Sequence, residues 1–208
     1  MSNTVLTQQP ATLSRLRAET RSQHEAIEQA LMLMSDQLTL PTYVHRLEQF
    51  FGFYKPVEDR IYDDSGPLGA WLAARLTAPL KLAKRRKAQL LEADLNVLRP
   101  GGMPLALCRH LPRLASAAEC FGCMYVLEGA SLGGVLISRH IETTLGVTPA
   151  TGGRFFKGYA EQTGAMWQEF RAAITEFSLT TDDDDAMIET ACATFEALRL
   201  WCEEEPCL

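Results

Sequence analysis

The chain has 208 residues, of which 47% are hydrophobic and 22% are charged, and its formal net charge is −6. These values are typical of a globular protein with a sizeable core, and the negative charge does not favour a nucleic-acid partner. The N-terminal residues lack a basic segment followed by an apolar run, and Glu128 interrupts the best apolar stretch before it reaches about 18 residues. We therefore expect a soluble cytoplasmic protein without a signal peptide or a membrane span.

The cysteines do not form a recognisable metal or redox motif. They are Cys108, Cys120, Cys123, Cys192, Cys202 and Cys207. Cys120 and Cys123 have CxxC spacing, but no second pair or ligand histidine supports zinc, and the pair falls within a helical pattern. A chain of this length without an export signal does not need a disulfide framework. We expect reduced thiols that are mostly packed in the core.

Residues 1–11 have no regular pattern, and we expect a disordered lead-in followed by one all-helical domain over residues 12–208. From Thr12 onward, inward-facing positions recur at alternating steps of three and four, which indicates a helical stripe. The stripe contains Leu13, Leu16, Thr20, His24, Ile27, Leu31 and Met34. His24 is therefore predicted to face inward, with Glu28 one turn further on. By spacing alone, a satisfied core histidine is a simpler interpretation of His24 than a metal ligand.

Further helices are predicted through the first half of the chain. Pro41 suits the first turn of an aromatic-rich helix that ends near Tyr62, and a short helix follows over Leu68–Leu76. The next helix is expected over Pro79–Val97. It carries the basic residues Lys81, Lys84, Arg85, Arg86 and Lys87. These form either a solvated face or a docking surface for an acidic partner.

The most unusual helix is predicted over Arg113–Thr144, because its apolar centre contains Gly129, Gly133 and Gly134. A glycine inside a helix costs about 1 kcal/mol relative to alanine, so three together need a reason. Gly129 and Gly133 share one face, and Gly134 is expected to broaden this bare patch. The backbone could bend there and a flat group could lie against it. Tight packing between soluble helices is the alternative.

Two more helices complete the chain, over Phe155–Phe177 and from the acidic run Asp182–Asp185 to about Glu205. The acidic run suits the start of a helix better than a metal site. No convincing strand alternation occurs, so the fold class is predicted to be all-α.

Several kinds of chemistry find no support in the sequence. It has no GxSxG nucleophile motif, no phosphate-loop or dinucleotide-binding glycine pattern, and no pair of ExxH motifs for a di-iron site. An inward histidine on an early helix and a bare later helix could instead enclose a flat apolar ligand. Heme fits this description, with an imidazole on one face and backbone on the other.

Two segments resemble the proximal and distal helices of heme oxygenases: LRAETRSQHEAIE (residues 16–28) and YVLEGASLGG (residues 125–134). A third, FFKGYAEQTGAMWQEF (residues 155–170), is similar to bacterial members that accompany bacterial phytochromes. The resemblance extends from about Leu13 to Trp201. It implies a single-domain helical bundle with a glycine-kinked distal helix.

The resemblance also implies roles for the heme-binding residues. His24 would be the neutral ligand of the heme iron, and Glu28 would fix the orientation and tautomer of its ring. Arg17 and Tyr125 match positions that contact heme propionates in the family. Arg171 is a further candidate late in the chain.

The distal helix would supply the catalytic surface through Gly129, Ser131 and Gly133, with Gly134 adding close approach to heme. The chain departs from the family immediately after the first glycine. There, other members have an aspartate or a serine that anchors water, and this chain has Ala130. Ser131, Arg139 or backbone carbonyl groups could hold that water instead.

The activity implied by the resemblance is oxidative opening of heme at a meso carbon, with heme as both cofactor and substrate. It would consume O2 and electrons from a ferredoxin, a flavodoxin or a reductase, and release biliverdin, CO and ferrous iron. A bacteriophytochrome is the implied acceptor of biliverdin, and no nucleic acid or membrane is expected as a partner. Two alternatives stay open: a heme carrier or sensor that never cleaves its ligand, and a related helical fold that acts on a thiamine-like molecule.

Overall fold

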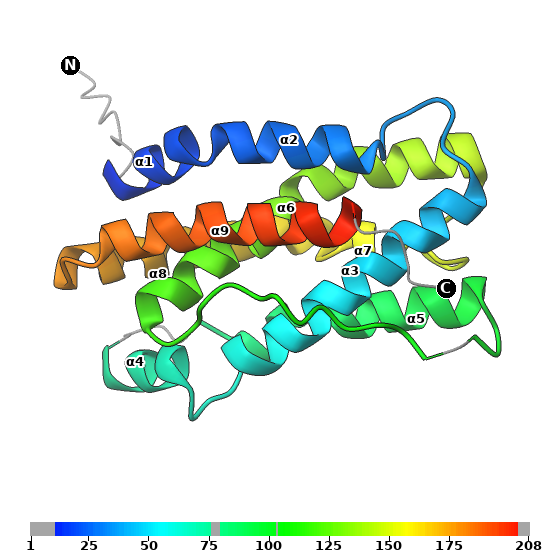
Figure 1. Ribbon diagram of the computed structural model, residues 1–208. Coiled ribbons are helices and arrows are strands. Elements are labelled where there is room, and N and C mark those ends of the chain that lie inside the picture. The colour runs from blue at the N-terminus through cyan, green and yellow to red at the C-terminus, as the bar shows by residue number, and fades with distance from the viewer. Residues whose placement is uncertain (1–10, 76–79, 103, 204–208) are drawn as a thin grey trace, which may run out of the picture.

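The computed structural model describes residues 11–75, 80–102 and 104–203, and every regular element within these ranges is a helix (Figure 1). The elements are α1 (Ala11–Glu19), α2 (Arg21–Leu31), α3 (Leu40–Ile61), α4 (Pro67–Arg75), the 3-10 turn η1 (Leu82–Arg85), α5 (Ala88–Leu98), α6 (Ala117–Leu145), α7 (Arg154–Lys157), the 3-10 turn η2 (Ala160–Gln162), α8 (Thr163–Thr180) and α9 (Asp184–Glu203). The predicted all-α, single-domain architecture is confirmed. The predicted disorder of the N-terminal segment lies outside the described residues except at Ala11, which begins α1.

The longest helix, α6, is the centre of the bundle and packs against α4, α7, α8 and α9. It begins with a capping box, in which the Ser116 side chain accepts the amide of Glu119 and the Glu119 carboxylate accepts the amide of Ser116. It ends where Gly146 adopts a left-handed φ of 69°. By length and composition α6 could cross a membrane, but half of its most apolar window is buried inside the protein. Burial of that kind is typical of a core helix in a globular fold.

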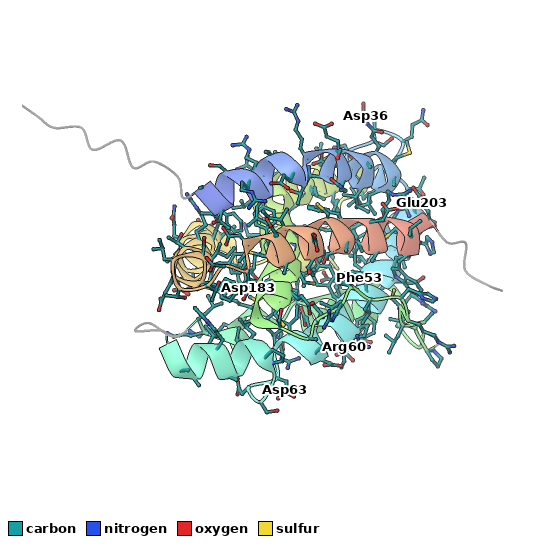
Figure 2. The ribbon with its side chains drawn as sticks, turned by 60° about the vertical axis from the view of Figure 1, so that its left-hand side comes forward. Asp36, Phe53, Arg60, Asp63, Asp183 and Glu203 are labelled. Carbon is teal, nitrogen blue, oxygen red and sulfur yellow. The ribbon has the colours of Figure 1, made fainter. Side chains whose placement is uncertain are left out.

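Aromatic rings fill the space beside α6. Phe121 packs edge-to-face on Trp71 of α4 at a centroid distance of 5.4 Å, and it lies 5.1 Å from Phe177 of α8. Phe53 of α3 is also fully buried and is labelled near the middle of Figure 2. Large rings of this kind contribute most of the apolar area that stabilises a helical core.

Helix α9 connects the two walls of the functional site. It runs from the side of Asp183 to that of Glu203 (Figure 2) and contacts α1, α2, α3 and α6. In Figure 1, α1 and α2 follow one another along α9. The side chains of α2 and α6 thereby come to border the same space.

Three predicted helices are interrupted or shortened. The first is divided between α1 and α2 at Thr20, whose hydroxyl donates to the carbonyl of Leu16 at 2.6 Å, and Met34 lies beyond α2 and is exposed. The predicted helix over Phe155–Phe177 is divided into α7, η2 and α8, because Gly158 ends α7 with φ 55°. Helix α6 begins at Ala117 rather than Arg113, at the Ser116 cap.

The predicted helix over Pro79–Val97 is wrong in its first half, where the described residues form η1 and a short connection before α5. Pro79 and Leu76 lie outside the described residues. The carboxylate of Glu58 on α3 accepts the amides of Lys87 and Ala88, at 2.6 Å and 3.2 Å, and so caps the beginning of α5 from a neighbouring helix. No local sequence pattern encodes a cap that comes from elsewhere in the fold.

The expectation of packed thiols is confirmed for the described cysteines. Cys108, Cys120, Cys123 and Cys202 are buried, and Cys192 is half-buried. Burial raises the pKa of the Cys120 thiol to about 11 and that of the Cys123 thiol to about 12. Cys207 lies outside the described residues.

Candidate functional site: a cavity between two helices

A cavity of about 850 Å³ lies between α2 and α6. Its volume is within the usual range for small-molecule and cofactor sites. Apolar side chains from α3, α7 and α9 border much of it, including Phe50, Phe155, Phe195 and Leu198. Eight site residues predicted from the sequence border it: Arg17, His24, Glu28, Tyr125, Gly129, Ser131, Gly133 and Gly134.

His24 stands on the cavity-facing side of α2. Its side chain is 54% exposed, so it is not the satisfied core histidine that the spacing alone favoured. The ring meets Phe195 of α9 edge-to-face at a centroid distance of 5.6 Å, which limits its orientations. Nδ1 faces Glu28, with 3.6 Å between Nδ1 and Oε2, and this leaves Nε2 as the nitrogen available to a ligand. The gap is too long for a direct hydrogen bond.

The opposite wall is the glycine segment of α6. A Cβ placed on Gly129 or Gly133 would have no atom within 4 Å, so both positions present bare backbone to open space. Gly134 differs, because a Cβ there would lie 2.7 Å from the carbonyl oxygen of Phe156. Gly134 borders the cavity, but its missing side chain allows α7 to approach α6. The prediction that Gly134 widens the bare patch is therefore wrong.

A basic and polar edge lies at the junction of α1 and α6. Burial raises the pKa of Tyr125, and it outweighs the nearby Thr20 hydroxyl and the charge of Arg17, which both act to lower it. Arg171 of α8 also borders the cavity, which brings this late basic residue to the same site. Arg139 is exposed and does not line the cavity, so its expected role in holding water is not supported.

The structure corrects the interpretation of the basic cluster that precedes α5. Arg85 and Lys87 are buried and do not lie on a docking surface. The Arg85 guanidinium donates to Glu128 Oε2 at 2.5 Å, and Tyr159 donates to Glu128 Oε1 at 2.8 Å. Lys87 Nζ donates to the carbonyl oxygen of Leu127 at 2.5 Å and to Ser131 Oγ at 2.6 Å.

This buried cluster of Arg85, Lys87, Glu128 and Tyr159 was not predicted from the sequence, although one signal was present. Glu128 is a single carboxylate in the most apolar helix, and a buried carboxylate needs a cation or several hydrogen bonds. Lys87 and Tyr54 are both buried, and both also border the cavity. Lys81 and Lys84 are the members of the cluster that are exposed.

The cavity has the features that heme requires. It offers one imidazole on one wall, bare backbone on the other, and basic side chains at an edge where propionates could bind. Within the described ranges no group of three His, Cys, Asp or Glu residues could hold a metal ion.

Sequence comparison identifies the family. The sequence profile described as heme oxygenase matches residues 11–204, which is most of the chain. The chain belongs to the heme oxygenase family. It is accordingly an enzyme of heme degradation. No curated protein sequence matches it.

Solved structures support the same fold for this heme oxygenase. The heme oxygenase of Neisseria meningitidis, solved with NO and CO bound, is 21% identical with a TM-score of 0.71, over 95% of this chain and 94% of that one. The heme oxygenase of Leptospira interrogans is 18% identical with a TM-score of 0.72, over 94% of this chain and all of that one. At such low identity the agreement concerns the fold.

Proposed function

We propose that this heme oxygenase opens heme at a meso carbon and releases biliverdin, CO and ferrous iron, using O2 and externally supplied electrons. The observation that carries the proposal is that His24 and the bare backbone of Gly129 and Gly133 border one cavity from opposite helices. Bound there, heme supplies the iron that reacts with O2 and also the porphyrin that is cleaved. The residues of the chain position it and shield it.

Each wall has a separate task in this proposal. His24 Nε2 would hold the iron, and the Glu28 carboxylate, 3.6 Å from Nδ1, would bias the tautomer of the ring by its charge. Gly129 and Gly133 let the backbone of α6 lie close to the porphyrin and restrict which meso edge is open to attack. Arg17, Tyr125 and Arg171 hold the propionates and thereby set the rotation of heme in the cavity.

We further propose that a ferredoxin, a flavodoxin or a reductase delivers the electrons and that a bacteriophytochrome receives the biliverdin. The phytochrome link depends on the resemblance of residues 155–170 to phytochrome-associated members. The docking surface for an acidic partner that the basic residues between Lys81 and Lys87 suggested cannot include Arg85 and Lys87, because both are buried. The cytoplasmic location stays a prediction from the sequence.

Reconstitution with hemin tests the proposal. The purified protein should bind one hemin with a Soret shift, and a reductase system with air should convert the complex to a green product that chromatographs as a biliverdin isomer. Intact heme recovered after full turnover conditions would contradict cleavage and favour a carrier or sensor. No Soret shift at all would contradict heme binding and favour the thiamine-related alternative. The isomer formed also identifies the meso carbon that is attacked.

A further inference from the structure

The contact between the beginning of α5 and α6 contains charged groups that heme binding at His24 does not explain. Lys87 is 3% exposed, and its ammonium group ends between the carbonyl oxygen of Leu127 and the hydroxyl of Ser131. Its Nζ also lies 3.5 Å from Glu128 Oε1 and 5.2 Å from the ring centroid of Tyr159. Burying an ammonium group is costly, so contacts this complete point to a defined task.

We propose that Lys87 is a positioning residue, which fixes the glycine segment of α6 and makes the Ser131 hydroxyl a hydrogen-bond donor to a polar group in the cavity. The proposal rests on the proposed function for the identity of the ligand that receives this hydrogen bond. It assigns to Lys87 and Ser131 the polar role that the methyl group of Ala130 cannot perform.

The first part of the proposal follows from where the ammonium group binds. Leu127 and Ser131 are one helical turn apart, and Gly129, with the least restricted backbone, lies between them. By bonding to both residues, Lys87 connects the beginning of α5 to α6 across this soft segment. The adjacent ion pair of Arg85 with Glu128 joins η1 to the same turn and adds a second fixed point.

The second part follows from the hydrogen-bonding capacity of serine. A hydroxyl group has one proton to donate and two lone pairs that accept. Ser131 Oγ accepts from Lys87 at 2.6 Å, and within the described part of the chain Ser131 has no other side-chain hydrogen bond. The usual acceptor for a helical serine, the carbonyl four residues earlier, is Leu127, which already accepts from Lys87 at 2.5 Å. The Ser131 proton is therefore left for the cavity that this residue borders. A neighbouring ammonium group strengthens such a donor.

A variant without the Lys87 ammonium group can still fold, because the charged groups around it have other partners. In Lys87→Met, Glu128 keeps its hydrogen bonds from Arg85 and Tyr159, so no buried charge is left without a partner. The Lys87 amide remains available to cap α5 through Glu58. The matched control is Lys84→Met, which removes the charge of an exposed lysine in η1.

Hydrogen exchange of the heme-free protein tests the positioning role. In Lys87→Met, amides of residues 129–134 should exchange about tenfold faster or more, the effect expected when a charge-assisted hydrogen bond to the segment is lost. Lys84→Met should exchange like the wild type. Unchanged exchange in a folded Lys87→Met protein would overturn the positioning role. This measurement needs no heme, so it stays decisive even if wild-type protein shows no Soret shift with hemin.

Carbon monoxide bound to the reduced heme complex tests the donor role. A nearby hydrogen-bond donor lowers the CO stretching frequency, so Ser131→Ala and Lys87→Met should both raise it. The double variant should shift the frequency no further than Ser131→Ala does, because Lys87 acts through the hydroxyl group. An unchanged frequency in Ser131→Ala overturns the donor role, and this holds even if Lys87→Met fails to fold.

Discussion

Among the individual residues, His24 is the one on which heme binding most depends, because it is the histidine that borders the cavity. In His24→Ala the iron loses its protein ligand, and we expect a displaced Soret band and a loss of turnover of more than 100-fold. Added imidazole should restore part of the spectrum, because the cavity wall is otherwise intact. Full activity in the absence of imidazole would contradict the assignment.

Glu28 is expected to matter much less than an ordinary partner of a metal-bound histidine. Such partners typically contribute 10–100-fold to metal affinity or activity. Here the carboxylate is 67% exposed and lies 3.6 Å from Nδ1, so solvent weakens its influence. We expect Glu28→Gln to lower turnover less than tenfold, with hemin affinity nearly unchanged. A loss as large as that of His24→Ala would show that the contact shortens when heme is bound.

For individual residues, the sequence predicts on which face of a helix a side chain lies, but not whether a charged side chain is buried. The stripe through Leu16, His24 and Ile27 was enough to orient His24, because a helical period places residues on faces. Spacing could not separate Lys84, which is exposed, from Lys87, which is buried. That difference depends on Glu128, some 40 residues away in the chain, whose burial creates the need for cations.

For the helix α6, the three glycines should respond differently to alanine. Gly129→Ala and Gly133→Ala place the methyl group in open space, so the gain in helix propensity should stabilise the heme-free protein by about 0.5–1 kcal/mol. Gly134→Ala places its methyl group against the Phe156 carbonyl, and overpacking there should destabilise the protein by about 1–3 kcal/mol. Urea unfolding of the three variants measures this difference, and equal effects would contradict the assigned packing.

Hemin binding should respond to substitutions in α6 in the opposite order from stability, because the glycines that face open space border the proposed heme site. A side chain at Gly133 enters the space proposed for heme, so Gly133→Leu should weaken hemin binding at least tenfold or change the biliverdin isomer formed. The heme-free Gly133→Leu protein should still unfold cooperatively, which separates this effect from a loss of fold. Wild-type affinity together with an unchanged product would remove Gly133 from the heme site.

Helices were predictable from the sequence where the hydrophobic pattern and the capping residues indicate the same limits. The aromatic-rich helix beginning at Pro41 and the glycine-bearing helix before Gly146 are present within a few residues of their expected limits. Helix ends that depend on distant groups were not predictable, such as the beginning of α5 under Glu58 and that of α7, where Asp94 accepts the amides of Arg154 and Phe155. These caps arise only when the helices have assembled.

For the whole molecule, the ion pair of Glu128 with Arg85 holds several parts of the bundle together. Arg85 also donates to the carbonyl oxygen of Met166 at 3.1 Å, so one buried guanidinium joins η1, α6 and α8. Removal of the carboxylate in Glu128→Ala leaves two buried cations, and we expect a loss of about 3–5 kcal/mol in the free energy of unfolding. Lys87→Met should cost less, because Glu128 keeps two partners. Urea unfolding provides the comparison, and equal losses would contradict this account.

The buried thiols make the free energy of unfolding of the whole protein depend on pH, and the direction of their pKa shifts gives the sign. The pKa of Cys120 is raised from 9.0 to about 11 and that of Cys123 from 9.0 to about 12, so above pH 9 the unfolded chain releases protons that the folded chain keeps. The free energy of unfolding should be insensitive to these thiols below pH 9. It should then fall as pH rises from 9 toward 11, by up to about 1.4 kcal/mol per pH unit for each thiol. Urea unfolding at pH 8, 9 and 10 measures the slope, which should be clearly smaller in Cys120→Ala and should change less in Cys192→Ala, because burial also raises the pKa of that thiol but it is only half-buried. An equal slope in Cys120→Ala would assign the loss to other groups.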